Sequence, residues 1–167
     1  MLVEKKMKKI EHLPILGVGP IIVAFQIAVT LVGILLSTLG YFNFGRIAVL
    51  DIPLKILGIG LILFGVYLYL SANFQSRVFD NITENKLVTT GVYSIVRNPI
   101  YSAFLLSCTG AVCIANNLVL FIAPILGWAF MTIVLKLSEE KWLKNLYGDE
   151  YLQYCKRVNR CIPWFSR

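Results

Sequence analysis

Two polar segments interrupt an otherwise apolar chain, and they hold the residues that could do chemistry. The first runs from Lys86 to Tyr101 (KLVTTGVYSIVRNPIY) and the second from Glu139 to Arg160. Tyr93 and Tyr101 in the first segment can present ring faces to a cation or an aromatic base. The second segment opens with a Glu pair, which can attract a cation where water is excluded. The only histidine, His12, lies near the amino terminus, so no obvious general base is present. We expect the two segments to form one site.

The composition is that of a membrane protein. Hydrophobic residues make up 57% of the 167 residues, and the mean hydropathy of +0.73 is too high for an ordinary soluble domain. The net charge is +7, but the basic residues flank the apolar blocks. This distribution favours anchoring at a membrane surface and argues against a nucleic-acid partner, which would need a basic face on a soluble scaffold.

Four apolar blocks predict the elements that position the polar segments. They cover about residues 13–39, 56–72, 100–114 and 118–137. At 1.5 Å per residue most can cross a bilayer, whereas 100–114 is short for a full span. We therefore expect an all-α polytopic membrane protein with about four transmembrane helices. Apolar residues at helical spacing after Leu137 add a short cytosolic C-terminal helix. Residues 1–167 are expected to form a single membrane-embedded domain, with two N-terminal spans in 13–72.

Small residues and turn residues refine this picture. Gly58, Gly60 and Gly65 lie in the second apolar block and predict a helix-packing face, because small residues let membrane helices approach closely. An alternative is that these glycines make room for a lipid-like substrate. The Asn116–Asn117 pair predicts a turn between the last two spans.

The distribution of Lys and Arg predicts the orientation. Basic residues gather in the amino-terminal segment 1–12, in 73–99 and from Lys136 onward, and only Arg46 and Lys55 lie in the loop after the first span. By the positive-inside rule, both termini and both polar segments are cytoplasmic. The expected location is a membrane of the cell inner membrane type, in contact with lipids.

The cysteines do not suggest a metal site or disulfides. Cys108, Cys113, Cys155 and Cys161 form no CxxC pair, and no His lies close by, so no metal is expected. Cys155 and Cys161 lie in the tail assigned to the cytosol, where thiols stay reduced.

The polar segments also carry a family pattern. The run LVTTGVYSIVRNPIY, followed some forty residues later by EEKWLKNLYGDEYLQYCKRVNRCIP, resembles the isoprenylcysteine carboxyl methyltransferase and phospholipid methyltransferase group of integral membrane enzymes. Several separately spaced elements agree in order, which makes the match specific. The resemblance implies an S-adenosylmethionine-dependent methyltransferase that acts on a lipophilic acceptor such as an isoprenylcysteine carboxylate, a thiol or a lipid, with a cofactor-binding region in 85–165.

The same resemblance implies roles for individual residues. Backbone groups of the segment from Asn85 to Val88 would meet the cofactor. Tyr93, Asn98, Pro99 and Tyr101 would line its pocket, and Glu139, rather than Glu140, would be its carboxylate partner. The implied cofactor-binding residues are Asn85, Lys86, Leu87, Val88, Tyr93, Asn98, Pro99, Ile100, Tyr101 and Glu139. Arg157 and Glu139 are the implied catalytic residues, and Lys136 and Tyr154 would meet the substrate.

Two positions depart from the family pattern. Asn98 stands where the family usually has His; Asn can still hydrogen-bond but cannot transfer a proton. Lys136 is the nearest basic residue before the Glu pair, where the family often has Arg. Methyl transfer is an in-line displacement that chiefly requires positioning, so a carboxylate or thiol acceptor suits a site without a base.

Other interpretations of the same residues stay open. Sterol reductases have a comparable Arg-x-Pro-x-Tyr region, so a membrane reductase that uses NADPH is one alternative, and a non-catalytic lipid-binding membrane protein is another. Residue by residue, Tyr93 and Tyr101 could be interfacial aromatics, Arg97 and Arg157 could extend to lipid headgroups, and the Glu pair could be solvated. The oligomeric state is open.

Overall fold

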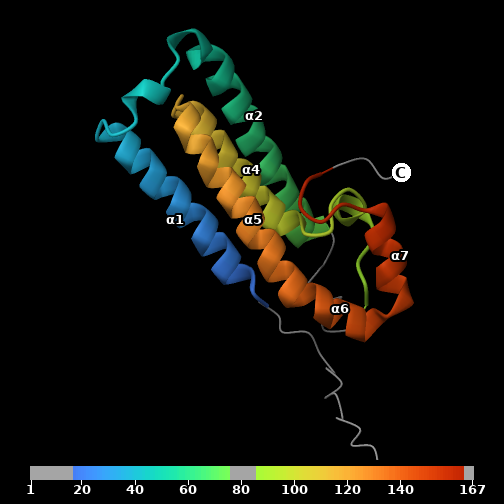
Figure 1. Ribbon diagram of the computed structural model, residues 1–167. Helices are drawn as coiled ribbons and strands as arrows, with labels where there is room; N and C mark the ends of the chain where they lie inside the picture. Colours follow the sequence, from blue (N-terminus) through green and yellow to red (C-terminus); the bar gives the residue numbers. More distant parts are fainter. Residues whose placement is uncertain (1–16, 76–85, 164–167) are drawn as a thin grey trace, which may run out of the picture.

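The computed structural model describes residues 17–75 and 86–163 (Figure 1). The predictions for Asn85, His12 and the amino-terminal lysines lie outside these residues. The principal helices are α1 (Gly19–Thr38), α2 (Asp51–Leu70), α4 (Pro99–Ile114), α5 (Ile122–Leu137), α6 (Glu139–Tyr147) and α7 (Asp149–Arg157). Shorter helical turns are η1 (Asn43–Gly45), η2 (Ala48–Leu50), η3 (Ser71–Gln75), η4 (Gly91–Ser94) and η5 (Leu118–Phe121).

Helices α1, α2, α4 and α5 lie side by side in an elongated bundle (Figure 1). Three helical stretches, Gly19–Thr38, Ala48–Phe74 and Leu118–Tyr147, are long and apolar enough to cross a membrane. The fourth, α4, has 16 residues and is shorter than a full span, as expected from its sequence. It nevertheless occupies the centre, because α1, α2 and α5 all pack against it. The prediction of an all-helical membrane protein is confirmed, and the chain is an integral membrane protein.

Glycines allow α2 and α4 to touch backbone to backbone. A Cβ atom on Gly58 would lie 2.5 Å from the carbonyl oxygen of Gly110, and one on Gly110 would lie 2.5 Å from that of Gly58. Gly65 meets Ser107 and the Ala103 carbonyl in the same way. The predicted packing face is therefore confirmed for Gly58 and Gly65. It is wrong for Gly60, which faces outward with nothing within 4 Å of its Cβ position.

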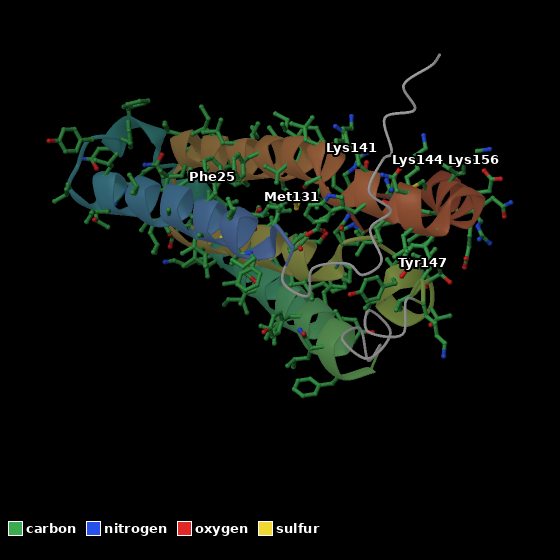
Figure 2. All side chains as sticks on the ribbon, turned by 90° about the horizontal axis from the view of Figure 1, so that it is seen from below. Phe25, Met131, Lys141, Lys144, Tyr147 and Lys156 are labelled. Carbon is green, nitrogen blue, oxygen red and sulfur yellow. The ribbon has the colours of Figure 1, made fainter. Side chains whose placement is uncertain are left out.

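Apolar side chains join α1 to α5 on the other side of α4. Phe25 and Phe130 stack with ring centroids 4.0 Å apart. Met131, which lies near α1 in Figure 2, is fully buried. Many large apolar side chains on the outer faces of α1, α2 and α5 are exposed. In a chain of this kind that surface faces lipid, which replaces protein as the apolar environment.

The Asn pair closes the end of the bundle that lies opposite α6 and α7. Asn116 adopts a φ of 47°, a conformation that Asn tolerates better than most residues. The Asn117 amide donates to Ser37 Oγ at 2.9 Å and to the Phe42 carbonyl at 2.8 Å. The predicted turn is confirmed, and it also holds the loop that joins α1 to α2.

At the other end the chain leaves the bundle through two short helices (Figure 1). The sequence predicted one short helix that ends at Gly148, which agrees with α6, and the structure adds a second helix, α7, after this glycine, whose φ is 55°. Only glycine adopts such a conformation without steric cost. The turn brings α7 back toward the loop that precedes α4, which places the second polar segment against the first.

Candidate active site

The C-terminal tail is hydrogen-bonded along the start of α4. The Arg97 amide donates to the Asn159 carbonyl at 2.8 Å, and the Asn98 side-chain amide donates to the Arg160 carbonyl at 2.9 Å. One turn later, Ser102 Oγ donates to the Cys161 carbonyl at 2.6 Å. Pro99 begins the helix, where its missing N–H leaves no bond unmade. These bonds join two segments that lie sixty residues apart in sequence.

A cavity of about 440 Å³ lies between the two segments and the adjacent ends of α1 and α2. Its volume falls within the range of small-molecule sites. Most of the residues singled out from the sequence line it: Lys86, Leu87, Val88, Tyr93, Asn98, Pro99, Ile100, Tyr101, Glu139 and Tyr154. The other lining residues were not predicted from the sequence. They are Gly17, Gly19, Pro20, Val23, Tyr69, Asn73, Arg97, Phe104, Trp142, Leu143, Tyr147 and Tyr151.

Glu139 connects three helices at the wall of this cavity. Its Oε1 accepts a hydrogen bond from the Tyr101 hydroxyl at 2.8 Å and another from the Val18 amide at 3.1 Å. Space beside it is tight, since a Cβ atom on Gly17 would collide with the carboxylate and one on Gly19 would lie 2.9 Å from the Tyr101 ring. A carboxylate fixed in this way presents a negative charge to the cavity.

The neighbouring Glu140 points elsewhere and does not line the cavity. Its Oε2 accepts from Arg160 Nη2 at 3.0 Å, and its Oε1 contacts Arg160 Nε and lies 3.2 Å from Arg97 Nη1. The pairing with Glu140 raises the pKa of Arg160. The two consecutive acids therefore differ in position: Glu139 faces the cavity, and Glu140 pairs with Arg97 and Arg160.

Arg97 is buried, which contradicts the alternative that it extends to lipid headgroups. Only 8% of its side chain is exposed. Nη1 donates to the Tyr151 hydroxyl at 3.2 Å and contacts the Cys155 thiol, and the guanidinium lies 5.9 Å from the centre of the Tyr151 ring. Arg97 also lines the cavity, so the motif Arg-Asn-Pro contributes a positive charge to the site.

Two buried tyrosines form neutral walls. The Tyr154 hydroxyl donates to the Tyr93 carbonyl, which fixes α7 against η4. Burial raises the pKa of both phenols above the ordinary value, and the Glu139 charge raises that of Tyr93 further. Both hydroxyls therefore stay protonated near neutral pH and supply ring faces and hydrogen bonds rather than a base.

Two residues assigned from the sequence do not line the cavity. On α5 the buried residues Met131 and Leu135 set the inward face, so Lys136 follows on the outside and is exposed. Arg157 is the exposed last residue of α7, and the chain turns inward again only at Val158. The structure thus places both side chains away from the cavity lining, and their predicted roles stay predictions. Asn85 lies outside the described residues.

The lining residues that sequence reasoning missed come mostly from helix ends. Tyr69 and Asn73, one turn apart, end the second span, and the Asn73 amide donates to the Tyr69 carbonyl at 2.8 Å. Here α2 continues into the wider turn η3, a feature that is frequent at functional sites. The signal available in the sequence was the i, i+3 spacing of Tyr151 and Tyr154, which places both rings near one face of α7.

Comparison with known proteins identifies the family. A model of the phospholipid methyltransferase family matches residues 54–150, which is more than half of the chain. The chain belongs to the phospholipid methyltransferase family. The matched range covers α2, α4, α5 and α6, and therefore most of the cavity wall. The resemblance seen in the sequence is confirmed.

Curated relatives match parts of this family member as well. It is 35% identical over 83 residues to protein-S-isoprenylcysteine O-methyltransferase B of Arabidopsis thaliana, a match covering 49% of this chain and 42% of the relative. The Schizosaccharomyces pombe protein-S-isoprenylcysteine O-methyltransferase is 33% identical over 113 residues, covering 63% and 48%. Methanethiol S-methyltransferase 1 of Bradyrhizobium diazoefficiens is 38% identical over 82 residues, covering 49% and 28%.

The family member thus spans less than half the length of these relatives. No solved structure matches it significantly.

Proposed function

We propose that this protein transfers a methyl group from S-adenosylmethionine to a lipophilic acceptor. The observation that carries the proposal is the single cavity wall formed by Glu139, Tyr93, Tyr101 and Arg97, side chains that the family motifs contribute from two distant segments. Membership of the phospholipid methyltransferase family supports it. So do the names of the relatives, which are O- and S-methyltransferases.

The lining residues fit the proposed methyl donor. S-adenosylmethionine carries an electrophilic methyl group on a sulfonium, an amino group, a carboxylate and an adenine. Glu139 would hold a cationic part, and the ring faces of Tyr93 and Tyr101 would lie against a cation or the adenine. Lys86, Leu87 and Val88, together with Asn98, Pro99 and Ile100, would enclose it. The lining provides both a carboxylate and a guanidinium, as a ligand with charges of both signs requires.

The chain's contribution to the reaction is position and exclusion of water. Methyl transfer needs the nucleophile in line with the methyl group, and fixing that geometry lowers the barrier without proton transfer. The cavity offers neutral tyrosines and Asn98 but no histidine among its described lining residues. An acceptor that is already an anion, or a thiol that ionises readily, would therefore react without a base.

Apolar residues on one side of the cavity suit a lipophilic acceptor. Val23 of α1, Ile100 and Phe104 of α4, and Tyr69 of α2 line the part that is formed by membrane helices. Tyr154 of α7 also lines the cavity, and we propose that it faces the polar end of the acceptor. A carboxylate, a thiol and a lipid headgroup all remain within this acceptor class.

The charge distribution supports a cytoplasmic site. Within residues 17–75 and 86–163, Lys86, Arg97 and the six basic residues from Lys136 to Arg160 lie at the cavity end of the bundle, whereas Arg46 and Lys55 lie at the other. Figure 2 shows three of them, Lys141, Lys144 and Lys156, on α6 and α7. By the positive-inside rule this end would be cytoplasmic, together with both termini.

Calorimetric titration of the detergent-purified protein with S-adenosylhomocysteine, and separately with NADPH, tests the proposal. Saturable binding of S-adenosylhomocysteine alone is the expected result and would justify a screen of acceptors with labelled methyl donor. Binding of NADPH alone would replace the proposal with a reductase. If folded protein binds neither ligand, a lipid-binding role without catalysis would be favoured.

A further inference from the structure

The buried charges beside the cavity do not balance. Arg97 and Arg160 share one carboxylate, that of Glu140, and the exposed fractions of the three side chains are 8%, 24% and 18%. Among the residues that the structure describes, two cations and one anion leave this cluster with a net positive charge and little access to water. An unbalanced buried charge is costly, and proteins usually offset it with a partner of opposite sign.

The excess charge is directed toward the cavity by Arg97. Glu140 engages Arg160 through both carboxylate oxygens, whereas only Oε1 faces Arg97. Arg160 does not line the cavity, and Arg97 does. Arg97 is therefore the member of the cluster that a ligand in the cavity can reach.

The guanidinium of Arg97 also has unused donors. A guanidinium carries five N–H groups, and the hydrogen bonds of Arg97 to Tyr151 and Cys155, like its pairing with Glu140, all involve Nη1. Its Nε is buried and has no hydrogen-bond partner among the residues that the structure describes. A buried donor of this kind normally has a partner, because an unmade bond costs the full desolvation of the group.

We propose that Arg97 binds a carboxylate of the ligand held in this cavity. A carboxylate matches the planar, paired N–H groups of a guanidinium and can accept two hydrogen bonds at once. It supplies the missing negative charge, and it can accept from the guanidinium where that group lines the cavity. This inference rests on the proposed function, which offers two sources of the group: the amino-acid end of the methyl donor, or an acceptor that is itself a carboxylic acid.

The assignment gives the cavity a polarity. Glu139 lines it as an anion and Arg97 as a cation, and the described residues show no ion pair between them. A ligand with both an amino group and a carboxylate would then be bound in a single direction, with its amino group toward Glu139.

Ligands that differ only in the carboxylate test the inference on the unmodified protein. Calorimetric titration would compare S-adenosylhomocysteine with its decarboxylated analogue, S-adenosyl-3-thiopropylamine. If Arg97 holds the donor's carboxylate, the analogue should bind about 10- to 100-fold more weakly, the usual effect of a lost charged hydrogen bond. R97Q should lose this discrimination, so that its two Kd values differ by less than about threefold.

R160Q is the matched control, because Arg160 pairs with the same Glu140 but lies outside the cavity lining. It should keep the discrimination. R97K, which keeps the charge but loses the paired N–H groups, should keep only part of it. Thermal melting of each variant shows that it is folded.

The remaining outcomes separate the two sources and the two proposals. If the wild type does not discriminate and R97Q instead raises the KM of a carboxylic-acid acceptor, but not of a thiol acceptor, the carboxylate belongs to the acceptor. Unchanged ligand preference and unchanged KM values in folded R97Q would overturn the anchor and leave the methyltransferase proposal standing. Failure of the folded wild type to bind S-adenosylhomocysteine would overturn both.

Discussion

Replacing Glu139 by Gln tests how the cavity holds a cationic ligand. The amide keeps an oxygen for the Tyr101 hydroxyl and the Val18 amide, now 2.8 and 3.1 Å from Oε1, so the change removes charge more than packing. If spherical, a cavity of about 440 Å³ is roughly 9 Å across. A cation bound between the centre of the cavity and the far wall would then lie about 5 to 9 Å from the carboxylate.

The expected loss of affinity follows from that range. With an effective dielectric constant of about 20, 332/(20 × 5) and 332/(20 × 9) give about 3.3 and 1.8 kcal/mol. Since about 1.4 kcal/mol corresponds to a tenfold change in Kd, E139Q should bind S-adenosylmethionine about 20- to 250-fold more weakly.

Calorimetric titration with two other Glu-to-Gln variants gives the comparison. E150Q alters an exposed acid on the first turn of α7, outside the cavity lining, and should change Kd less than about twofold. E140Q removes the partner of Arg97 and Arg160, so it should lower the melting temperature. Its Kd should change less than that of E139Q. Equal loss of affinity in E139Q and E140Q, or a change below threefold in E139Q, would refute the assignment of Glu139 to the cation.

Three further predictions concern other parts of the structure. N98H should retain or raise activity, because an imidazole N–H can replace the amide that donates to the tail carbonyl; loss of S-adenosylhomocysteine binding would show that the pocket is built differently. G110V should lower the free energy of unfolding by about 1 to 3 kcal/mol, since its Cβ would lie 2.5 Å from a carbonyl oxygen of α2. G60V, with nothing within 4 Å of its Cβ position, should change the melting temperature little. Similar melting temperatures of the two variants would contradict the close packing of α2 against α4. Burial raises the pKa of Cys161 to about 11, so at pH 8 only about 0.1% of this thiol is thiolate. Iodoacetamide should therefore modify the half-buried Cys155 first and Cys161 only as the pH approaches 11, as followed by mass spectrometry. Equal rates at pH 8 would contradict the burial of Cys161.

The sequence by itself determined the class of fold and the segments that form the site. Long apolar blocks with flanking basic residues are sufficient to predict membrane helices, because backbone groups in lipid must bond within the segment. Turn residues fixed the boundaries: Asn116 and Asn117 marked the loop between spans, and Pro99 the start of α4. The motif residues were identifiable because their order and spacing are characteristic of a family.

Only the tertiary structure decided which side chains share the cavity. Periodicity places Glu139 and Glu140 in the same helical turn, but it cannot say that one meets Tyr101 and the other meets Arg160. Periodicity also could not show that Lys136 lies outside the cavity lining, because the direction of its side chain depends on which face of α5 packs against α1.

Arg97 illustrates the physical reason for this difference. From the sequence it could as well reach lipid headgroups, and its burial follows from contacts with α7, more than fifty residues away. Local sequence determines helix propensity and hydrophobic pattern, since these depend on neighbouring residues. The environment of a charge depends on which distant segments pack around it, and here the bonds between the C-terminal tail and the start of α4 decide that.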